Sequence, residues 1–375
     1  MRKLSMVEAV CLIAGAGIGG GVMAVPYLAA QTGFWSALMI MLAAYIVTVV
    51  LHIMVAELSI RTEYSSELLT VFTKHLFHDK KSFRVVFYVL MAMILICIPA
   101  AYITGAGEIL ANLLGISPVL GGVLFFVLAA SVVFLGLKFI AINETLMLAV
   151  MLALLTVLVV NTLRLPVQQP LAPARWEVSP LLAVYGMAMF TLSSLFSVPQ
   201  AASGLRGTKR RLTAAVGLGL LINFIVMVVI TLCTLVSSNT VTEVAIIGWA
   251  AALGGSTRVF GSLFIVLAML TTFWSISLQL ADMTREFFGV GRIPGWLAAT
   301  APSLLLALLP LTGFLDLMQI AGGAVALFIA IMTVPAYQNA VRNADGLLLG
   351  YAGKSRILCG AVVFMYFLMA IASFV

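Results

Sequence analysis

Long apolar segments recur along the whole chain, and they limit its fold more than any other feature. Of the 375 residues, 63% are hydrophobic and 9% are charged, whereas soluble domains carry about 25% charged residues. Apolar segments of membrane-spanning length lie at residues 7–30, 34–61, 85–113, 119–137, 144–164, 180–204, 212–237, 256–284, 295–309, 313–335 and 356–375. Backbone groups in a bilayer must be satisfied internally, which favours helices. The pattern predicts an all-α integral membrane protein with eleven transmembrane helices in one domain, residues 1–375.

The 20 Lys and Arg residues indicate how this chain is oriented in the bilayer. With a cytoplasmic N-terminus, all but three of them fall in cytoplasmic connections, and the exceptions are Arg164, Arg175 and Arg258. Basic residues accumulate on the cytoplasmic side of membrane proteins. We therefore expect a cytoplasmic N-terminus, an external C-terminus and a place in a prokaryotic inner membrane. Because orientation accounts for the net charge of +7, the charge indicates the lipid bilayer as partner and no nucleic acid.

A proline-containing linker divides the chain into two comparable halves. Residues 165–179 include Pro166, Pro170 and Pro173 and separate residues 7–164 from residues 180–335. Each half holds five predicted spans, and an odd number makes the second half enter the membrane in the opposite orientation. The sequence thus predicts an inverted repeat of five plus five helices, followed by an extra eleventh helix at residues 356–375.

The first apolar segment contains five glycines within residues 15–21. Each glycine costs a helix roughly 1 kcal/mol relative to alanine, so the helix is expected to break there. The corresponding position of the second half has Thr191, Ser193 and Ser194, whose hydroxyls can satisfy unwound backbone. We predict discontinuous helices 1 and 6. The alternatives are tight helix packing at the glycines and a simple kink at Pro199.

These residues resemble known membrane permeases over nearly the whole chain. The stretch GAGIGGGVMAVPYLAAQTGF at residues 15–34 resembles the first-helix signature of the amino acid/polyamine/organocation superfamily. The resemblance is closest to the hydroxy and aromatic amino acid permeases and the amino acid/auxin permeases. It continues at residues 56–62, 197–207, 241–248 and 272–280. It implies the LeuT-type five-plus-five fold and the import of amino acids, commonly with protons.

A zwitterionic amino acid needs partners for both of its charges at mid-membrane depth. The N–H groups at the start of the outer half of helix 1 suit the carboxylate, and we expect it at Gly17, Gly19, Gly20 and Gly21. Carbonyls at the end of the outer half of helix 6 suit the ammonium group. The expected residues there and around the ligand side chain are Phe190, Thr191, Ser193, Ser194, Tyr102 and Trp274.

No cofactor or metal is expected, and the coupling ion is H⁺ or Na⁺, with H⁺ favoured. In sodium-coupled relatives, paired hydroxyls on helix 8 hold sodium, which implies a role for Thr271 and Thr272 unless they only cap their own helix. The lysine that some proton-coupled relatives place on helix 5 is absent between residues 144 and 164. Ionisable groups inside spans are functional candidates. Glu108 is the first choice, and Glu57 is the second unless it only pairs with Arg61.

The leading function is a secondary active transporter that imports a neutral or aromatic amino acid by cation symport with alternating access. The alternative is an amino-acid-sensing receptor subunit that binds without transport. A divalent-metal transporter of the same fold is disfavoured, because Gly17–Gly20 and Ser197–Pro199 offer no carboxylate, thioether or imidazole. An enzyme is disfavoured because no span centre pairs a nucleophile with a base.

Overall fold

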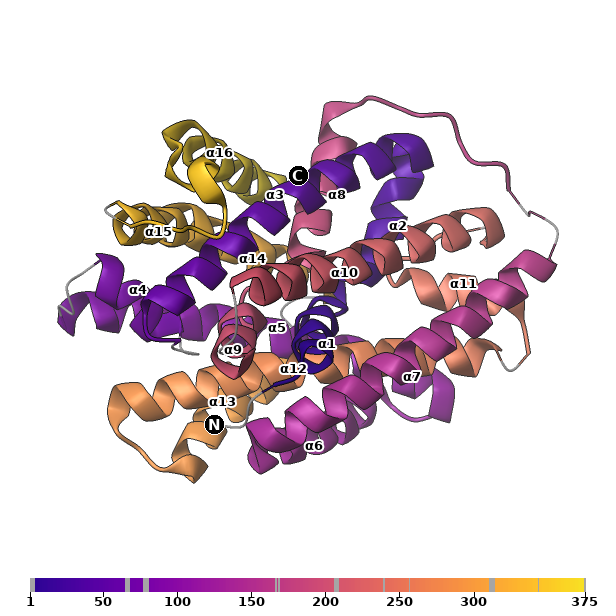
Figure 1. Cartoon of the computed structure of the whole chain (residues 1–375). Coiled ribbons are helices and arrows are strands. Elements are labelled where there is room, and N and C mark those ends of the chain that lie inside the picture. Colours follow the sequence, from indigo (N-terminus) through magenta and orange to yellow (C-terminus); the bar gives the residue numbers. More distant parts are fainter. Residues whose placement is uncertain are drawn as a thin grey trace.

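The protein is described by a computed structural model that covers residues 4–64, 68–76, 81–165, 167, 169–205, 209–238, 240–255, 257–309, 314–342 and 344–373. Pro166, residue 313 and the last two residues of the predicted eleventh span lie outside this set. The described residues form helices and no strands (Figure 1). The α-helices of the first half are α1 (Met6–Gly17), α2 (Gly21–Thr32), α3 (Phe34–Arg61), α4 (Leu68–Leu76), α5 (Lys81–Leu114), α6 (Pro118–Leu135) and α7 (Leu137–Arg164).

The remaining helices follow the extended linker. They are α8 (Val178–Thr191), α9 (Ser197–Leu205), α10 (Lys209–Ser237), α11 (Ala245–Leu253), α12 (Thr257–Phe288), α13 (Arg292–Leu308), α14 (Phe314–Phe328), the π-helical η1 (Ile329–Thr333), α15 (Val334–Val341), the 3-10 helix η2 (Gly350–Lys354) and α16 (Arg356–Ala372). Among the described residues, seven helices are long and apolar enough to cross a membrane, or eight if α1 and α2 form one span. The helices α8 and α16 are apolar but shorter.

The first apolar segment is two helices rather than one. A capping box starts α1: the Ser5 hydroxyl accepts from the Glu8 backbone N–H, and the Glu8 carboxylate accepts from that of Ser5. This helix ends within the glycine cluster, where Ile18 leaves helical geometry with ψ at 75°. The chain resumes as α2 at Gly21, and the two helix axes meet at 55°. The glycines therefore coincide with the end of regular helix.

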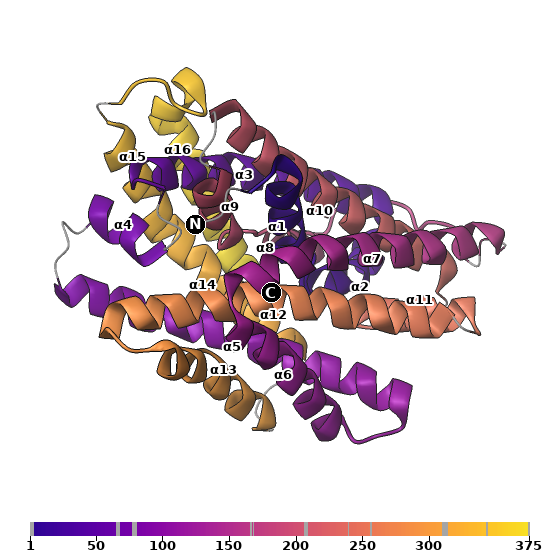
Figure 2. The same cartoon turned by 60° about the horizontal axis from the view of Figure 1, so that its bottom comes forward.

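The sixth apolar segment is also interrupted. Regular helix ends at Thr191 in α8 and restarts at Ser197 in α9, with Leu192–Phe196 between them in turns. Both interruptions lie in the middle of the molecule, because α1 packs against α9 and α10, and α2 packs against α8 and α10. The two views show α1 surrounded by other helices (Figures 1 and 2).

The long helices α5, α7, α10 and α12 frame this centre. Figure 2 shows α12 running beside α5, with α13 packed against both. The last helix, α16, packs against α8 and α14, where the Tyr185 hydroxyl donates to the carbonyl of Met365. The short helix α11 was not predicted, and it is held by a 2.8 Å hydrogen bond from the Trp249 indole to the Thr162 hydroxyl of α7.

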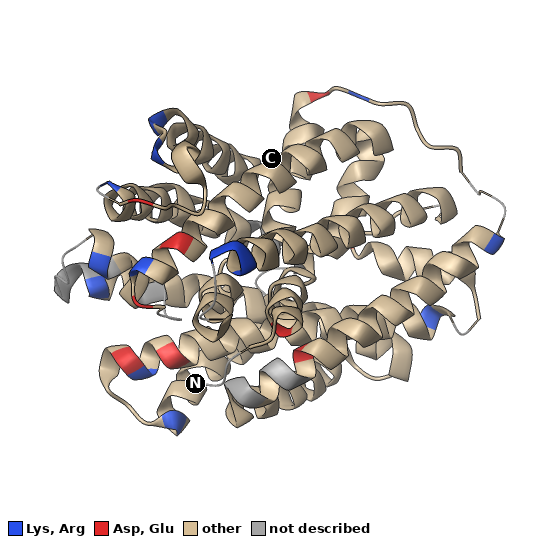
Figure 3. Cartoon of the chain, in the orientation of Figure 1, with Lys and Arg blue, Asp and Glu red and all other residues tan. Residues whose placement is uncertain are grey.

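Charged residues avoid the middle of the long helices. Figure 3 shows that basic residues gather mostly at the end of the bundle that holds α4, α15 and the start of α10. The linker between the halves runs over the opposite end, where the Arg175 N–H donates to the carbonyl of Thr32 at 2.8 Å. The basic residues thus lie toward the ends of the bundle (Figure 3), as expected where its middle crosses the core of a bilayer.

Candidate substrate site

The break between α1 and α2 is shaped by side chains that press on its glycines. A methyl group built on Gly17 would lie 1.8 Å from Asn223 Nδ2, and one on Gly19 would lie 2.6 Å from the Tyr102 hydroxyl. One on Gly21 would lie 2.8 Å from Thr191 Oγ1. Three of the five glycines are therefore needed for close approach by polar groups of other helices, whereas Gly15 has open space beside it.

Ser194 is the hub of the break between α8 and α9. Its backbone N–H donates to His52 Nε2 at 2.9 Å, and its hydroxyl donates to the carbonyl of Ile13 at 2.8 Å. Nδ1 of His52 lies 2.8 Å from the Thr48 carbonyl, so Nδ1 carries the proton and Nε2 is the acceptor. Asn223 Nδ2 also donates to the Ser194 hydroxyl at 3.4 Å. The Ser194 N–H, at the break between α8 and α9, is thus satisfied by His52 of α3. The Ser194 hydroxyl in turn satisfies the Ile13 carbonyl of α1, near the other break.

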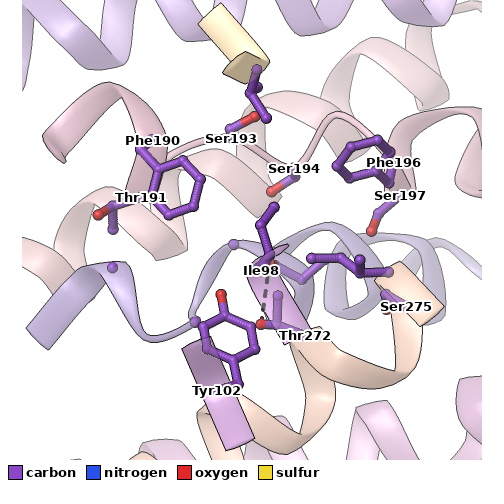
Figure 4. A pocket seen from close by; sticks show the side chains of 16 residues that line it. Ile98, Tyr102, Phe190, Thr191, Ser193, Ser194, Phe196, Ser197, Thr272 and Ser275 are labelled. Atoms are coloured by element: carbon purple, nitrogen blue, oxygen red, sulfur yellow. Dashed lines mark hydrogen bonds between the residues drawn. The ribbon is translucent and has the colours of Figure 1, made fainter. Parts of the chain in front are cut away.

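A narrow cavity lies between the two breaks. The volume in which a water-sized sphere can be centred is about 30 Å³, enough for roughly two waters. Figure 4 shows Phe190 and Thr191 of α8 on one side of it, and Tyr102 of α5 with Thr272 of α12 on another. The lining residues are Ala16, Gly17, Gly19, Gly21, Ile98, Tyr102, Phe190, Thr191, Ser193, Ser194, Phe196, Ser197, Thr272, Ser275, Ile276 and Val325.

The cavity collects most of the residues predicted to bind substrate. The structure brings Gly17, Gly19, Gly21, Tyr102, Phe190, Thr191, Ser193 and Ser194 to its wall. Gly20 is not among the lining residues, but its backbone interacts with the hydroxyl of Tyr102, which is. The buried Trp274 of α12 is not part of the lining, and its indole nitrogen has no hydrogen-bond partner among the described residues.

The predicted coupling residues lie in three different places. The Thr271 hydroxyl is 3.5 Å from the Gly15 carbonyl and the Thr272 hydroxyl is 3.4 Å from the Ala16 carbonyl, so both face the end of α1. Each also donates to the carbonyl of Ala268 in its own helix, at 3.0 and 3.1 Å. The hydroxyls therefore do both things considered from the sequence: they cap their helix and they point toward α1 carbonyls.

The two acidic candidates are not among the residues that line the cavity. Glu57 is buried, with Oε1 2.6 Å from Arg61 Nη2 and Oε2 accepting from the Leu348 N–H at 2.7 Å. Glu108 is exposed on α5, near enough to Glu243 for their charges to interact. Glu57 is thus engaged in the ion pair with Arg61 that its spacing suggested.

Several site residues escaped the sequence analysis. Ser197 and Ser275 line the cavity, while His52 and Asn223 hold Ser194. A polar residue in the middle of an apolar span was the available signal for His52 and Asn223. The signal for Ser275 was its place one helical turn beyond Thr271 and Thr272, on the same face.

This all-helical bundle of apolar helices has the LeuT-type fold of its structural neighbours, which are membrane transporters. The manganese transporter of Eremococcus coleocola superposes with a TM-score of 0.73 at 14% identity, covering 100% of this chain and 88% of that chain. MhsT in complex with L-phenylalanine superposes at 0.66 with 17% identity, covering 100% and 98%. Mhp1, a nucleobase-cation-symport-1 family transporter, superposes at 0.68 with 13% identity, covering 99% and 91%.

The sequence narrows the class to a family. Residues 2–372 match the tryptophan/tyrosine permease family, and the chain belongs to it. No protein of curated function matches the chain by sequence. The family and the structural neighbours are transporters rather than enzymes.

Proposed function

We propose that this permease imports a neutral or aromatic amino acid by secondary active transport. The observation that carries the proposal is the cavity between the two helix breaks, with backbone and hydroxyl groups on one part of its wall and aromatic rings on another. Membership of the tryptophan/tyrosine permease family makes tryptophan and tyrosine the first substrates to test. That MhsT binds L-phenylalanine within the same fold supports an amino acid ligand.

The proposed ligand pose follows from the helix ends at the cavity. The carboxylate lies at Gly17, Gly19, Gly20 and Gly21, where the start of α2 offers backbone N–H groups. The ammonium group lies at the end of α8, near the carbonyls of Phe190 and Thr191. The hydroxyls of Ser193 and Ser194 complete the polar side. The rings of Tyr102 and Phe190 line the apolar side, and we place the buried Trp274 of α12 among the residues that select the ligand side chain.

The proposed topology joins the helix pairs across the breaks. The pairs α1/α2 and α8/α9 are then discontinuous spans 1 and 6, and α14, η1 and α15 form span 10. With α3, α5, α6, α7, α10, α12, α13 and α16, this makes eleven spans. Residues 7–164 and 180–335 are the inverted repeats, and α16 is the additional helix. The N-terminus is cytoplasmic and the C-terminus external in this arrangement.

Transport needs the lining helices to separate. A cavity with room for roughly two waters admits an amino acid only when the side chains around it move apart. We propose alternating access, in which the halves rock about the two breaks. Thr271 and Thr272, facing the α1 carbonyls, are where Na⁺ would lie if sodium is the coupling ion. We favour H⁺.

Exchange in proteoliposomes tests the proposal. We expect the purified protein to exchange radiolabelled tryptophan, with tyrosine and phenylalanine competing better than serine or alanine. The Phe190→Ala variant should lose this preference because it removes the ring that lines the cavity. Phe364→Ala, which removes a ring 65% exposed on α16, should retain it.

The same measurements separate the alternatives. Saturable binding without exchange would contradict transport and support an amino-acid sensor. An absence of both binding and exchange across the amino acids would contradict the proposed function altogether.

A further inference from the structure

Glu144 is a fully buried carboxyl group that the proposed binding site does not use. It lies near the start of α7 and is 1% exposed. Its Oε1 lies 2.6 Å from the Ser275 hydroxyl of α12, in a hydrogen bond that the serine donates to a carboxylate and that a protonated carboxyl can donate instead. Its Oε2 has no hydrogen-bond partner among the described residues. A buried carboxylate with a single neutral partner is costly, which favours the neutral, protonated form in this conformation.

No basic side chain faces Glu144 within the described part of the chain. The helices packed against α7 are α1, α6, α10, α11 and α12. The titratable groups of α1 are Glu8 and Cys11, and the Cys11 thiol lies close enough to both Glu144 and Glu8 to interact with their charges. Helices α6 and α11 carry no titratable residue, and the nearest one to Ser275 on α12 is Asp282, two turns away. On α10, Lys209, Arg210 and Arg211 are exposed at its start, and Cys233 lies near its other end.

Ser275 connects this carboxyl group to the cavity. Its side chain contributes to the cavity wall (Figure 4), on the same face of α12 as Thr272 one turn before it. A serine hydroxyl can donate one hydrogen bond at a time, while it can accept from another donor. When Glu144 is ionised, that single donor is used by the carboxylate. When Glu144 is protonated, the carboxyl can donate to Ser275, and the serine hydroxyl is then free to donate into the cavity.

We propose that Glu144 is the proton-binding site of this permease and that Ser275 transmits its protonation state to the bound amino acid. The inference rests on the proposed function and names its coupling site. A proton from external water forms the O–H bond at Glu144, and the same bond breaks when that proton passes to internal water. The Ser275 hydroxyl released by protonation favours a ligand carboxylate, so proton and substrate bind cooperatively. By linkage, each raises the affinity for the other by the same factor.

The test compares purified wild type, Glu144→Gln and Glu108→Gln in proteoliposomes. The wild type should accumulate labelled tryptophan under an inward proton gradient, and its Kd should rise up to about tenfold per pH unit above the titration point, as expected for one linked proton. Glu144→Gln mimics the protonated form, so it should exchange tryptophan with a pH-independent Kd and lose accumulation under the gradient. Glu108→Gln, a matched change at an exposed carboxyl, should behave as the wild type.

A second variant covers the case in which Glu144→Gln does not fold. Ser275→Ala keeps the carboxyl and removes the hydroxyl link, and it should flatten the pH dependence of the Kd. Proton-driven accumulation by folded Glu144→Gln, loss of coupling in Glu108→Gln instead, or a full pH dependence in Ser275→Ala would overturn the inference. Accumulation of tryptophan by the wild type under a Na⁺ gradient alone would also overturn the inference about Glu144, but it would leave the proposed transport function standing. A wild type without tryptophan exchange or binding would overturn the proposed function, and this inference with it.

Discussion

Gly15 and Gly17 stand two residues apart in α1, but their neighbours differ. Nothing lies within 4 Å of a methyl group built on Gly15. The same methyl on Gly17 meets Asn223 Nδ2 and also lies 2.8 Å from Ser194 Oγ. Because Asn223 is buried and bonded to Ser194, it cannot move aside without disturbing the hub of the second break. Both residues are glycines in the sequence, and only the side chains packed against Gly17 distinguish it from Gly15.

We therefore expect Gly17→Ala to destabilise the protein by about 1–3 kcal/mol, the usual cost of overpacking, and to slow tryptophan exchange. Gly15→Ala should change stability by no more than about 0.5 kcal/mol in the destabilising direction. Thermal unfolding of the purified variants measures the difference. Adding Asn223→Ser to Gly17→Ala should recover part of the loss, since it shortens the clashing side chain. Equal effects of the two alanine substitutions would show that steric contact is not why Gly17 is needed.

At the scale of elements, the short helix α4 is docked by a few specific contacts. The Phe72 ring packs against Phe87 of α5 and Phe328 of α14, with centroid distances of 5.7 and 5.3 Å, and those two rings also contact each other. Its last turn is held by His75, whose Nε2 lies 3.1 Å from the Thr62 hydroxyl after α3. Aromatic contacts on one face and a polar contact in the last turn therefore anchor this helix.

The docking of α4 should depend on pH through His75. Burial, aided by the positive charges of Lys74 and Arg61, holds the pKa of His75 below its ordinary value of 6.5. The unfolded state then binds the proton more readily, so stability is complete above about pH 6.5 and is lost as pH falls toward the lowered pKa. Thermal unfolding at pH 5.5 and 7.5 should show this decrease in the wild type and a smaller one in His75→Gln. An identical decrease in both proteins would assign the effect to other groups.

At the scale of the whole molecule, charge distribution and fold together define an orientation. The end of the bundle with α4, α15 and the start of α10 carries most of the basic residues (Figure 3). Because basic residues accumulate on the cytoplasmic side of membrane proteins, we propose that this end is cytoplasmic. The proposal places the end of α16 on the external side, because this one helix follows the basic segment that precedes it.

Reporter fusions check this orientation. Alkaline phosphatase attached after residue 375 should be active, because it folds only outside the cytoplasm, and a fluorescent protein there should be dark. Attached after residue 342, at the end of α15, the two reporters should give the opposite result. The reverse pattern at both sites would invert the proposed topology.

The sequence alone determined the class of fold, an all-helical membrane protein, and it predicted the residues at which helices 1 and 6 would be interrupted. Apolar length, basic asymmetry and the glycine cluster depend on local composition and on the bilayer as solvent, and these need no knowledge of tertiary contacts. The prediction of the site used the glycine cluster for α1, the symmetry of the two halves for the hydroxyls of α8, and bulky aromatic residues for Phe190 and Tyr102. Ser275, His52, Asn223 and Glu144 were not predicted, because each acquires its role from a partner more than 25 residues away.

Only the tertiary structure decided which polar residues act together. Glu57, Glu108 and Glu144 are equally visible as acids in or near apolar segments, yet one is paired with Arg61, one is exposed, and one is buried beside the cavity wall. The glycines of the cluster likewise differ: side chains of other helices lie close to Gly17, Gly19 and Gly21, whereas Gly15 has open space beside it. The physical reason is that burial and hydrogen bonding are properties of packed helices, and a single chain position carries neither until its neighbours are in place.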